Sequence, residues 1–213
     1  MRPPIEQEIE DAEVEVADSQ QQQTAVMLVS TRLAGNAVIR VVNRCNEAQE
    51  SNDLDLSECQ LMQIPDAIYL LLQNTHLIKC DLSNNVISKL PVKFAERFSS
   101  ITELNLSHNQ ISKLPEQLSE MKSLQKLNIS YNSFIELPEP VSRLSELTSL
   151  IANNNFIIDV DVRTLESCLK HLKEVDLMEN PLNTPTVEAL ERELPFSVSF
   201  TPPTDEDWRD LDN

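Results

Sequence analysis

Three residues near the middle of the chain have the types that hydrolytic enzymes use. Ser107 and His108 could act as nucleophile and base, and Asp81 as the acid that orients the base. On a strand, however, consecutive side chains point to opposite faces, so Ser107 and His108 are badly placed to share a proton. We therefore expect no catalytic residues and no enzymatic activity.

A second group of polar residues has the oxygen ligands that calcium prefers. Asp55, Asp81 and Asn105 fall at equivalent places in successive segments of the chain. Neighbouring strands of a sheet lie about 5 Å apart, so these oxygens could converge on one ion. The alternative is a pair of solvated carboxylates of like charge. We adopt that alternative and expect neither a metal nor a cofactor.

The elements that position these residues are repeated. The segments LIKCDLSNNVISKLP, ITELNLSHNQISKLP and LQKLNISYNSFIELP superpose without gaps on the pattern L-x-x-L-x-L-x-x-N-x-L-x-x-L-P. The same frame continues in both directions, which gives six repeats over residues 51–183. We number positions within each repeat from its first residue. The repeats begin at Ser51, Leu77, Ile101, Leu124, Leu147 and Leu172.

The residue types of the pattern predict one coil of a solenoid. Its first apolar residues form a short strand whose side chains point inward, and neighbouring coils pair their strands in a parallel sheet. An amide at position 9 can satisfy buried backbone groups, and a cysteine can do so more weakly. After the L-P pair, we expect a short α or 3₁₀ helix on the convex side. The position 9 residues are Cys59, Asn85, Asn109, Asn132, Asn155 and Asn180.

Both ends of such a stack need a cap, because an end coil exposes its apolar face. Apolar residues spaced by three or four predict a capping helix within residues 26–50. Residues 184–203 predict a C-terminal cap with a helix near 186–194 and an extended segment near 196–200. We expect a disordered acidic N-terminus over residues 1–25 and an acidic tail over residues 204–213.

Composition excludes several classes of function. The chain has 213 residues and a single glycine, Gly35, so glycine-rich phosphate-binding loops cannot form. A net charge of -18 argues against nucleic acid as a partner, and no apolar run approaches 18 residues, so no membrane span is expected. The start lacks the pattern of a secretory signal, and four widely spaced cysteines indicate free thiols. We expect a cytoplasmic protein, with the nucleus left open.

The repeats resemble those of intracellular leucine-rich-repeat proteins that carry an L-P pair after each coil. The resemblance covers residues 51–183, and the flanking segments AVIRVVNRCNEAQES and ENPLN extend it to about residues 34–200. It implies an α/β solenoid between an N-terminal helical cap and a C-terminal cap. It also implies a non-catalytic role as an adaptor or regulator that binds another protein.

We expect the binding surface on the outer face of the sheet, which is the concave side of such a solenoid. A central aromatic, Tyr131, suits a binding anchor, although Tyr131 and His108 could also merely tolerate solvent. The acids near both ends of the face predict a basic partner protein, bound by a monomer. We also placed the position 7 residues, such as Ser83, Ser107 and Ser130, on this face. The predicted protein-binding residues are Asp55, Asp81, Asn105, His108, Asn128, Tyr131, Asn154 and Asp176.

The tail supports a second hypothesis. In the segment DEDWRDL, Trp208 and Leu211 lie three residues apart among acids. This pattern resembles a class of peptide that adds a strand to a ubiquitin-like autophagy protein and inserts both side chains into pockets. The alternative is a tail that is solvated or packs back on the C-terminal cap.

Overall fold

The structure is a computed structural model that describes residues 37–202. The predicted acidic N-terminus, residues 26–36 of the predicted helix, and the tail with Trp208 and Leu211 lie outside the described residues. Contacts divide the chain into two units, Met1–Arg40 and Val41–Asn213. Only residues 37–40 of the first unit are described, and they are helical. All that follows concerns the second unit by itself.

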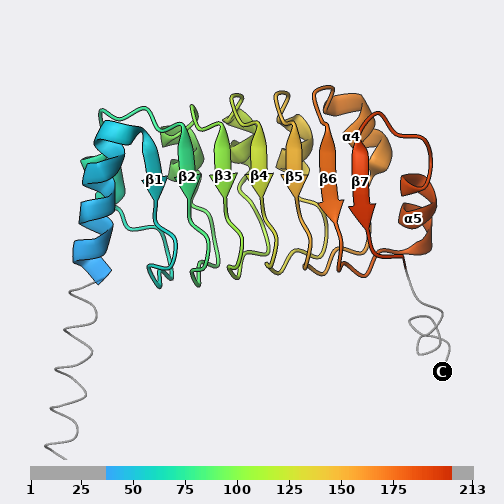
Figure 1. Cartoon of the computed structure of the whole chain (residues 1–213), viewed down its shortest axis with the longest axis horizontal. Coiled ribbons are helices and arrows are strands. Elements are labelled where there is room, and N and C mark those ends of the chain that lie inside the picture. Colours follow the sequence, from blue (N-terminus) through green and yellow to red (C-terminus); the bar gives the residue numbers. More distant parts are fainter. Residues whose placement is uncertain (1–36, 203–213) are drawn as a thin grey trace, which may run out of the picture. The chain divides into compact units, whose positions relative to one another are not determined.

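A parallel sheet forms the framework, and its strands follow one another in sequence order (Figure 1). Each coil contributes one strand, and equivalent positions of neighbouring coils pair directly, as Leu54 does with Cys80 and Cys80 with Leu104. Position 4 points inward while positions 3 and 5 point outward. The strands are β1 (Asp53–Asp55), β2 (Lys79–Asp81), β3 (Glu103–Asn105), β4 (Lys126–Asn128), β5 (Ser149–Ile151), β6 (Glu174–Leu177) and β7 (Ser197–Phe200).

Short helices cover the opposite side of the core, as the spacing after each L-P pair predicted. Each begins just after position 15, and in the middle coils that position is a proline with extended backbone. Two of these elements are 3₁₀ helices, η1 (Glu116–Glu120) and η2 (Glu139–Arg143). The α-helices are α2 (Ala67–Leu71), α3 (Val92–Arg97) and α4 (Val162–Cys168).

The two ends of the stack differ in construction. At the N-terminal end, the helix continues to residue 51, and it buries Val41, Cys45 and Ala48 in the core. Their spacing of three or four residues places them on one face of that helix. At the C-terminal end, α5 (Thr184–Leu190) is followed by β7, which pairs with β6 as a seventh parallel strand. The extended segment expected near 196–200 is therefore part of the sheet.

A ladder of buried asparagines at position 9 binds each coil to the one before it. The Asn85 side chain donates to the carbonyls of Leu56 and Leu82, each at 2.9 Å, and accepts the N–H of Leu61 at 2.9 Å. Equivalent bonds recur at Asn109, Asn132, Asn155 and Asn180. One amide thus satisfies buried backbone groups from two coils.

Cys59 heads the position 9 column, where no earlier repeat offers carbonyls for an amide to bind. Its thiol is buried in the core instead. Neighbouring Cys45 is also buried, and desolvation together with the proximity of Cys59 raises the pKa of Cys45 to about 11. Burial also raises the pKa of Cys80, so these thiols stay protonated at neutral pH and are poor nucleophiles.

Tyr69 on the convex side carries a buried polar atom without a partner. Its ring stacks on Phe98 with centroids 5.8 Å apart, and Lys93 lies 4.3 Å from the ring centroid. The hydroxyl is buried and has no hydrogen bond, and desolvation with nearby Asp66 raises the pKa of Tyr69 to about 12. The contacts of Tyr69 with Phe98 and Lys93 are therefore made by its ring, and its hydroxyl takes no part in them.

We expect Tyr69→Phe to stabilise the protein by about 1 kcal/mol, because it removes an unsatisfied buried group and keeps the ring contacts. Chemical denaturation monitored by circular dichroism measures the change. Tyr69→Leu provides the control, since it removes the hydroxyl and the ring together and should be destabilising. A loss of stability in Tyr69→Phe would mean that the hydroxyl has a favourable partner.

Candidate functional site

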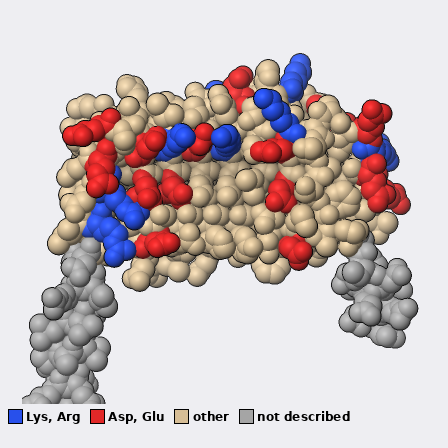
Figure 2. Space-filling model, in the orientation of Figure 1, with Lys and Arg blue, Asp and Glu red and all other residues tan. Residues whose placement is uncertain are grey.

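The outer face of the sheet is hollowed into a broad groove. A volume of about 440 Å³ lies over β1 to β5 and is bounded by outward residues of positions 3 and 5. Figure 2 shows this face, with a row of alternating charges crossing the strands. Beside that row, acids gather toward the two ends and leave an uncharged stretch between them.

Position 3 carries an ion-pair ladder that the sequence analysis left out. Lys79 and Lys126 reach the carboxylate of Glu103 from the strands on either side, at 3.4 and 3.2 Å. The hydrogen bond from Lys126, with a further contribution from Lys79, lowers the pKa of Glu103. The alternation of strand residues could have placed position 3 on this face. The ladder makes the groove mixed in charge, not simply acidic.

Position 5 has a structural role in addition to its exposure. The Asp81 carboxylate accepts the Ser83 N–H at 2.8 Å, and the Asn128 side chain accepts the Ser130 N–H at 3.0 Å. The same contact occurs at Asp55, Asn105 and Asp176, so each side chain caps the turn that ends its strand. This requirement for Asp or Asn explains the acids and amides of the predicted strip. At position 5 of the fifth repeat, Ile151 replaces them.

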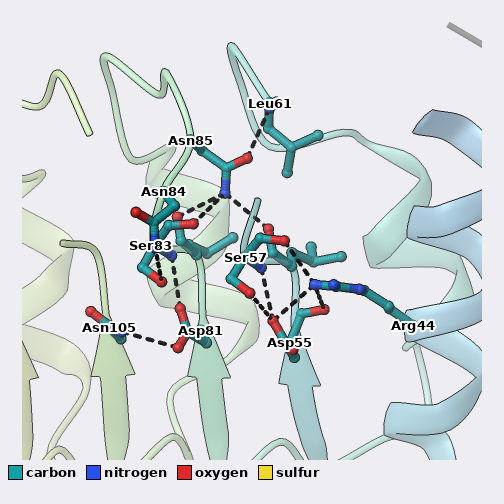
Figure 3. A network of polar contacts seen from close by, with 11 residues as sticks. Arg44, Asp55, Ser57, Leu61, Asp81, Ser83, Asn84, Asn85 and Asn105 are labelled. Atoms are coloured by element: carbon teal, nitrogen blue, oxygen red, sulfur yellow. Dashed lines mark hydrogen bonds and ion pairs between the residues drawn. The ribbon is translucent and has the colours of Figure 1, made fainter. Parts of the chain in front are cut away.

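Arg44 from the N-terminal helix reaches Asp55 at the first strand, as Figure 3 shows. Its guanidinium lies 2.9 Å from the Asp55 carboxylate and donates to the carbonyls of Asp55 and Ser57 at 3.0 and 2.8 Å. In later coils these two carbonyls accept N–H groups of the preceding coil, as Asp81 accepts from Leu56. Arg44 therefore supplies to the first coil the hydrogen-bond donors that each later coil receives from the coil before it.

The Asp55 carboxylate is accordingly engaged within the chain. Partial burial alone would raise the pKa of Asp55, but the hydrogen bonds from Ser57 and the charge of Arg44 outweigh it and lower the pKa. Asp81 forms no ion pair with another described residue; its second oxygen accepts the Asn105 amide at 3.0 Å. Asp81 and Asp176 are thus the acids of this column that have no ion-pair partner among residues 37–202.

The prediction that the position 7 serines lie on the outer face was wrong for three coils. Ser83, Ser107 and Ser130 are buried in the turn after each strand, where the Ser130 hydroxyl donates to the Asn128 side chain at 2.7 Å. Ser107 is therefore withdrawn from solvent while the neighbouring His108 is exposed. Within residues 37–202, no group of histidine, cysteine and acidic side chains could hold a metal ion.

Position 8 adopts a left-handed backbone in every repeat. The φ angle is 53° at His108 and 52° at Tyr131, and Asn84 and Asn154 share it. This conformation directs the N–H of Tyr131 to the Asn153 carbonyl of the next coil, at 3.0 Å. Asparagine tolerates the left-handed region well, whereas a bulky tyrosine is an uncommon occupant.

His108 and Tyr131 stack on each other at the strand ends. Their ring centroids are 4.0 Å apart and the ring planes differ by 12°. Tyr131 remains 45% exposed. The structure thus brings together two of the predicted site residues as one aromatic surface, formed by adjacent coils. The spacing of the repeats predicted their proximity, but not the backbone conformation that displays them.

Comparison with known proteins agrees with the coil geometry. The family model described as "Leucine rich repeat" matches residues 75–134, which span the second and third coils and part of the fourth. The coils that it matches are leucine-rich repeats. The predicted α/β solenoid of leucine-rich repeats is confirmed.

Two curated proteins that are similar to this chain carry the same name. The chain is 37% identical over 97 residues to leucine-rich repeat-containing protein 20 of Homo sapiens, covering 43% of this chain and 52% of the relative. It is 40% identical over 79 residues to the Mus musculus protein of that name, covering 34% and 42%. The matches thus span about half the length of these relatives.

Solved structures show the same fold at lower identity. The leucine-rich repeat domain of APL1B matches with a TM-score of 0.54 at 20% identity, covering 70% of this chain and 41% of that one. An internalin from Listeria monocytogenes matches with a TM-score of 0.50 at 21% identity, covering 66% and 41%. Across residues 37–202, no helix is long and apolar enough to cross a membrane.

Proposed function

We propose that this protein is a non-catalytic adaptor or regulator that binds another protein through the outer face of its sheet. The stacked pair of His108 and Tyr131 forms the anchor, and Asp81 and Asp176 flank it. Leucine-rich repeats serve as protein-interaction modules, and a rigid sheet that displays an aromatic surface matches the composition of binding hot spots.

The observation that supports this proposal most strongly is the cost of displaying Tyr131. A residue other than glycine or asparagine in the left-handed region costs about 1–2 kcal/mol. Asparagine occupies position 8 at Asn84 and Asn154, and glutamate occupies it at Glu58 and Glu179, so the coil itself does not require an aromatic residue there. A tyrosine that is held there and left 45% exposed is poorly explained by stability alone.

The charges indicate the character of the partner. Asp81 and Asp176 lack ion pairs among the described residues, whereas Glu103 is neutralised by two lysines. A partner that inserts lysine or arginine beside Asp81 and Asp176 would gain charge-assisted bonds, so we propose a basic protein surface. Such binding weakens with rising salt.

We place this function in the cytoplasm or nucleus. Cys45, Cys59 and Cys80 are free thiols buried in the core, and Cys168 is a free thiol at the surface. Free thiols of this kind persist in a reducing compartment. The proposal is compatible with the absence of a membrane-spanning helix within residues 37–202.

We expect Tyr131→Asn to abolish capture of the partner while leaving thermal unfolding unchanged within a few degrees. Asparagine removes the aromatic surface but suits the left-handed backbone, as it does at Asn84 and Asn154. Asp81→Asn, which keeps the cap of Ser83, should reduce capture and its dependence on salt. The measurement is affinity capture from lysate with quantitative mass spectrometry.

Two comparisons decide the interpretation of that capture experiment. Gln110→Ala, an exposed change on a neighbouring coil, provides the matched control and should capture partners at the level of the native chain. A chain that ends at Pro203 tests the alternative in which Trp208 and Leu211 recruit the protein. Partners that are still captured by Tyr131→Asn but are lost from the truncated chain would show that the tail, and not the outer face of the sheet, binds them.

A further inference from the structure

A second surface lies along the edge formed by the loops that follow the strands. In the second to fifth coils, positions 12 and 13 of this loop are exposed and position 11 is buried, while position 14 is buried except at half-buried Leu137. These loops run after the arrowheads of β2 to β5 in Figure 1. Backbone bonds hold them in register, since Gln110 donates to Ile87 and Phe156 donates to Phe134. Residues at one position therefore form a straight column along this loop edge.

The position 13 column has two bases followed by two acids. Lys89 and Lys113 belong to the second and third repeats, and Glu136 and Asp159 to the fourth and fifth. The backbones of Glu136 and Asp159 pair as neighbours in a parallel bridge. All four side chains are exposed, and none forms an ion pair within residues 37–202. The Asp159 carboxylate accepts the Thr186 hydroxyl at 2.9 Å, a neutral donor that leaves its charge unpaired, so all four charges can pair with another molecule.

Exposed apolar side chains accompany the acids. Ile135 is 62% exposed, Phe156 is 59% exposed and Ile158 is 52% exposed, all on the fourth and fifth coils. The corresponding places in the third coil are Gln110 and Ser112. The repeat therefore does not require apolar residues at these positions, although exposed Val86 and Met62 occupy them in the second and first coils. Contiguous exposed apolar groups of this kind mark interaction sites.

We propose that this loop edge joins two copies of the chain in a symmetric dimer. A two-fold axis that lies in the contact plane, between the third and fourth coils, reverses the order of coils and preserves the position number. It brings Lys113 of each copy against Glu136 of the other, and Lys89 against Asp159. The same operation places Phe156 opposite Val86, which is also exposed.

The order of charges selects this occupant. Two bases followed by two acids are complementary to themselves only when the second copy runs in the opposite direction, as in a closed two-fold dimer. A parallel arrangement would oppose like charges. A purely basic partner would be repelled by Lys89 and Lys113, and a purely acidic one would be repelled by Glu136 and Asp159. The dimer replaces our expectation of a monomer.

Sedimentation equilibrium of the full chain tests the dimer. We expect the mass to rise from 24.2 kDa toward twice that value with concentration, and the association to weaken at high salt. In the dimer, residue 113 of each copy faces residue 136 of the other. Lys113→Glu makes both of these residues acidic and Glu136→Lys makes both basic. Each variant alone should therefore remain a monomer, because like charges would face each other. Neither side chain forms a hydrogen bond in the described structure, so both variants should fold.

The decisive sample is an equimolar mixture of the two charge variants. The acidic copy and the basic copy complement each other in both halves of the contact, so the mixture should form a heterodimer although neither component dimerises. Phe156→Gln, which copies Gln110 and Gln60 of other coils, should weaken the native dimer at least tenfold. Circular dichroism verifies that each variant is folded.

Two results would overturn the proposal. One is a native chain that stays monomeric up to about 1 mM, the weak limit of specific association. The other is a native dimer that persists in Lys113→Glu and in Glu136→Lys, which would place the contact on another surface. Because Tyr131→Asn and Lys113→Glu alter different residues, loss of dimerisation and loss of partner capture can be observed separately.

Discussion

Replacement of Asn155 by alanine is expected to lower the free energy of unfolding by about 3–4 kcal/mol. The Asn155 amide donates to the carbonyls of Ile129 and Ala152 at 3.0 and 3.1 Å, and its oxygen accepts the Phe134 N–H at 3.1 Å. Alanine leaves these buried groups without partners. Urea denaturation monitored by circular dichroism measures the loss.

The chain provides its own control two residues away. Asn153 lies in the same Asn-Asn-Asn tract, but its side chain forms no hydrogen bond in the described structure. Asn153→Ala should therefore change the free energy of unfolding by less than about 0.5 kcal/mol. Equal effects at Asn153 and Asn155 would show that helix and turn propensities in this tract, and not the ladder, determine the stability.

Loss of Arg44 should open the N-terminal end of the stack. Arg44→Met keeps much of the aliphatic side chain but removes the donors to the carbonyls of Asp55 and Ser57 and the ion pair with Asp55. Hydrogen bonds to a charged group contribute about 1.5–3 kcal/mol, and we expect a loss in that range. Hydrogen exchange should show faster exchange in β1 and little change in β5.

Arg143→Met is the matched control for Arg44→Met. Arg143 forms ion pairs with Glu116 and Glu139 on the exposed convex side, where solvent screens them, so its loss should change stability little. The native chain and Arg44→Met should also differ less at low pH. Because the pKa of Asp55 is lowered in the folded protein, its ionised carboxylate contributes to the free energy of unfolding in full at neutral pH. This contribution is lost as the pH falls below about 3.9, the pKa of aspartate in the unfolded chain. A uniform rise in exchange across all strands would contradict a local role for Arg44.

The sequence predicted those parts of the fold that repeat. The inward residues at positions 4, 6 and 11 recur in every coil, and the asparagine at position 9 recurs in every coil after the first, so the pattern is distinguished from a chance match. The short strands and convex helices follow from the same frame. The column Asp81, Asn105, Asn128 was likewise found, because equal positions in equal coils must lie side by side.

Features that occur once, or that no single residue type marks, were not predicted from the sequence. Arg44 lies in a helix without repeats, and nothing in its neighbourhood distinguishes it from Arg40. The left-handed backbone at Tyr131 was also missed, because glycine, the usual marker of that conformation, is absent from the coils. The asparagines at position 8 in two coils were the sequence signal for this left-handed backbone. The ladder of Lys79, Glu103 and Lys126 could have been predicted from strand alternation.

The asparagine ladder also bears on how such a molecule changes its length in evolution. Every junction between inner coils is closed by the same atoms, whereas Arg44 closes one end, and at the other the Thr201 hydroxyl accepts the Glu179 N–H at 2.9 Å. Duplication or deletion of one whole coil would therefore create no new kind of contact. The binding face would grow or shrink in steps of about 5 Å, the spacing between strands, while the contacts of Arg44 and Thr201 at the two ends remain unchanged.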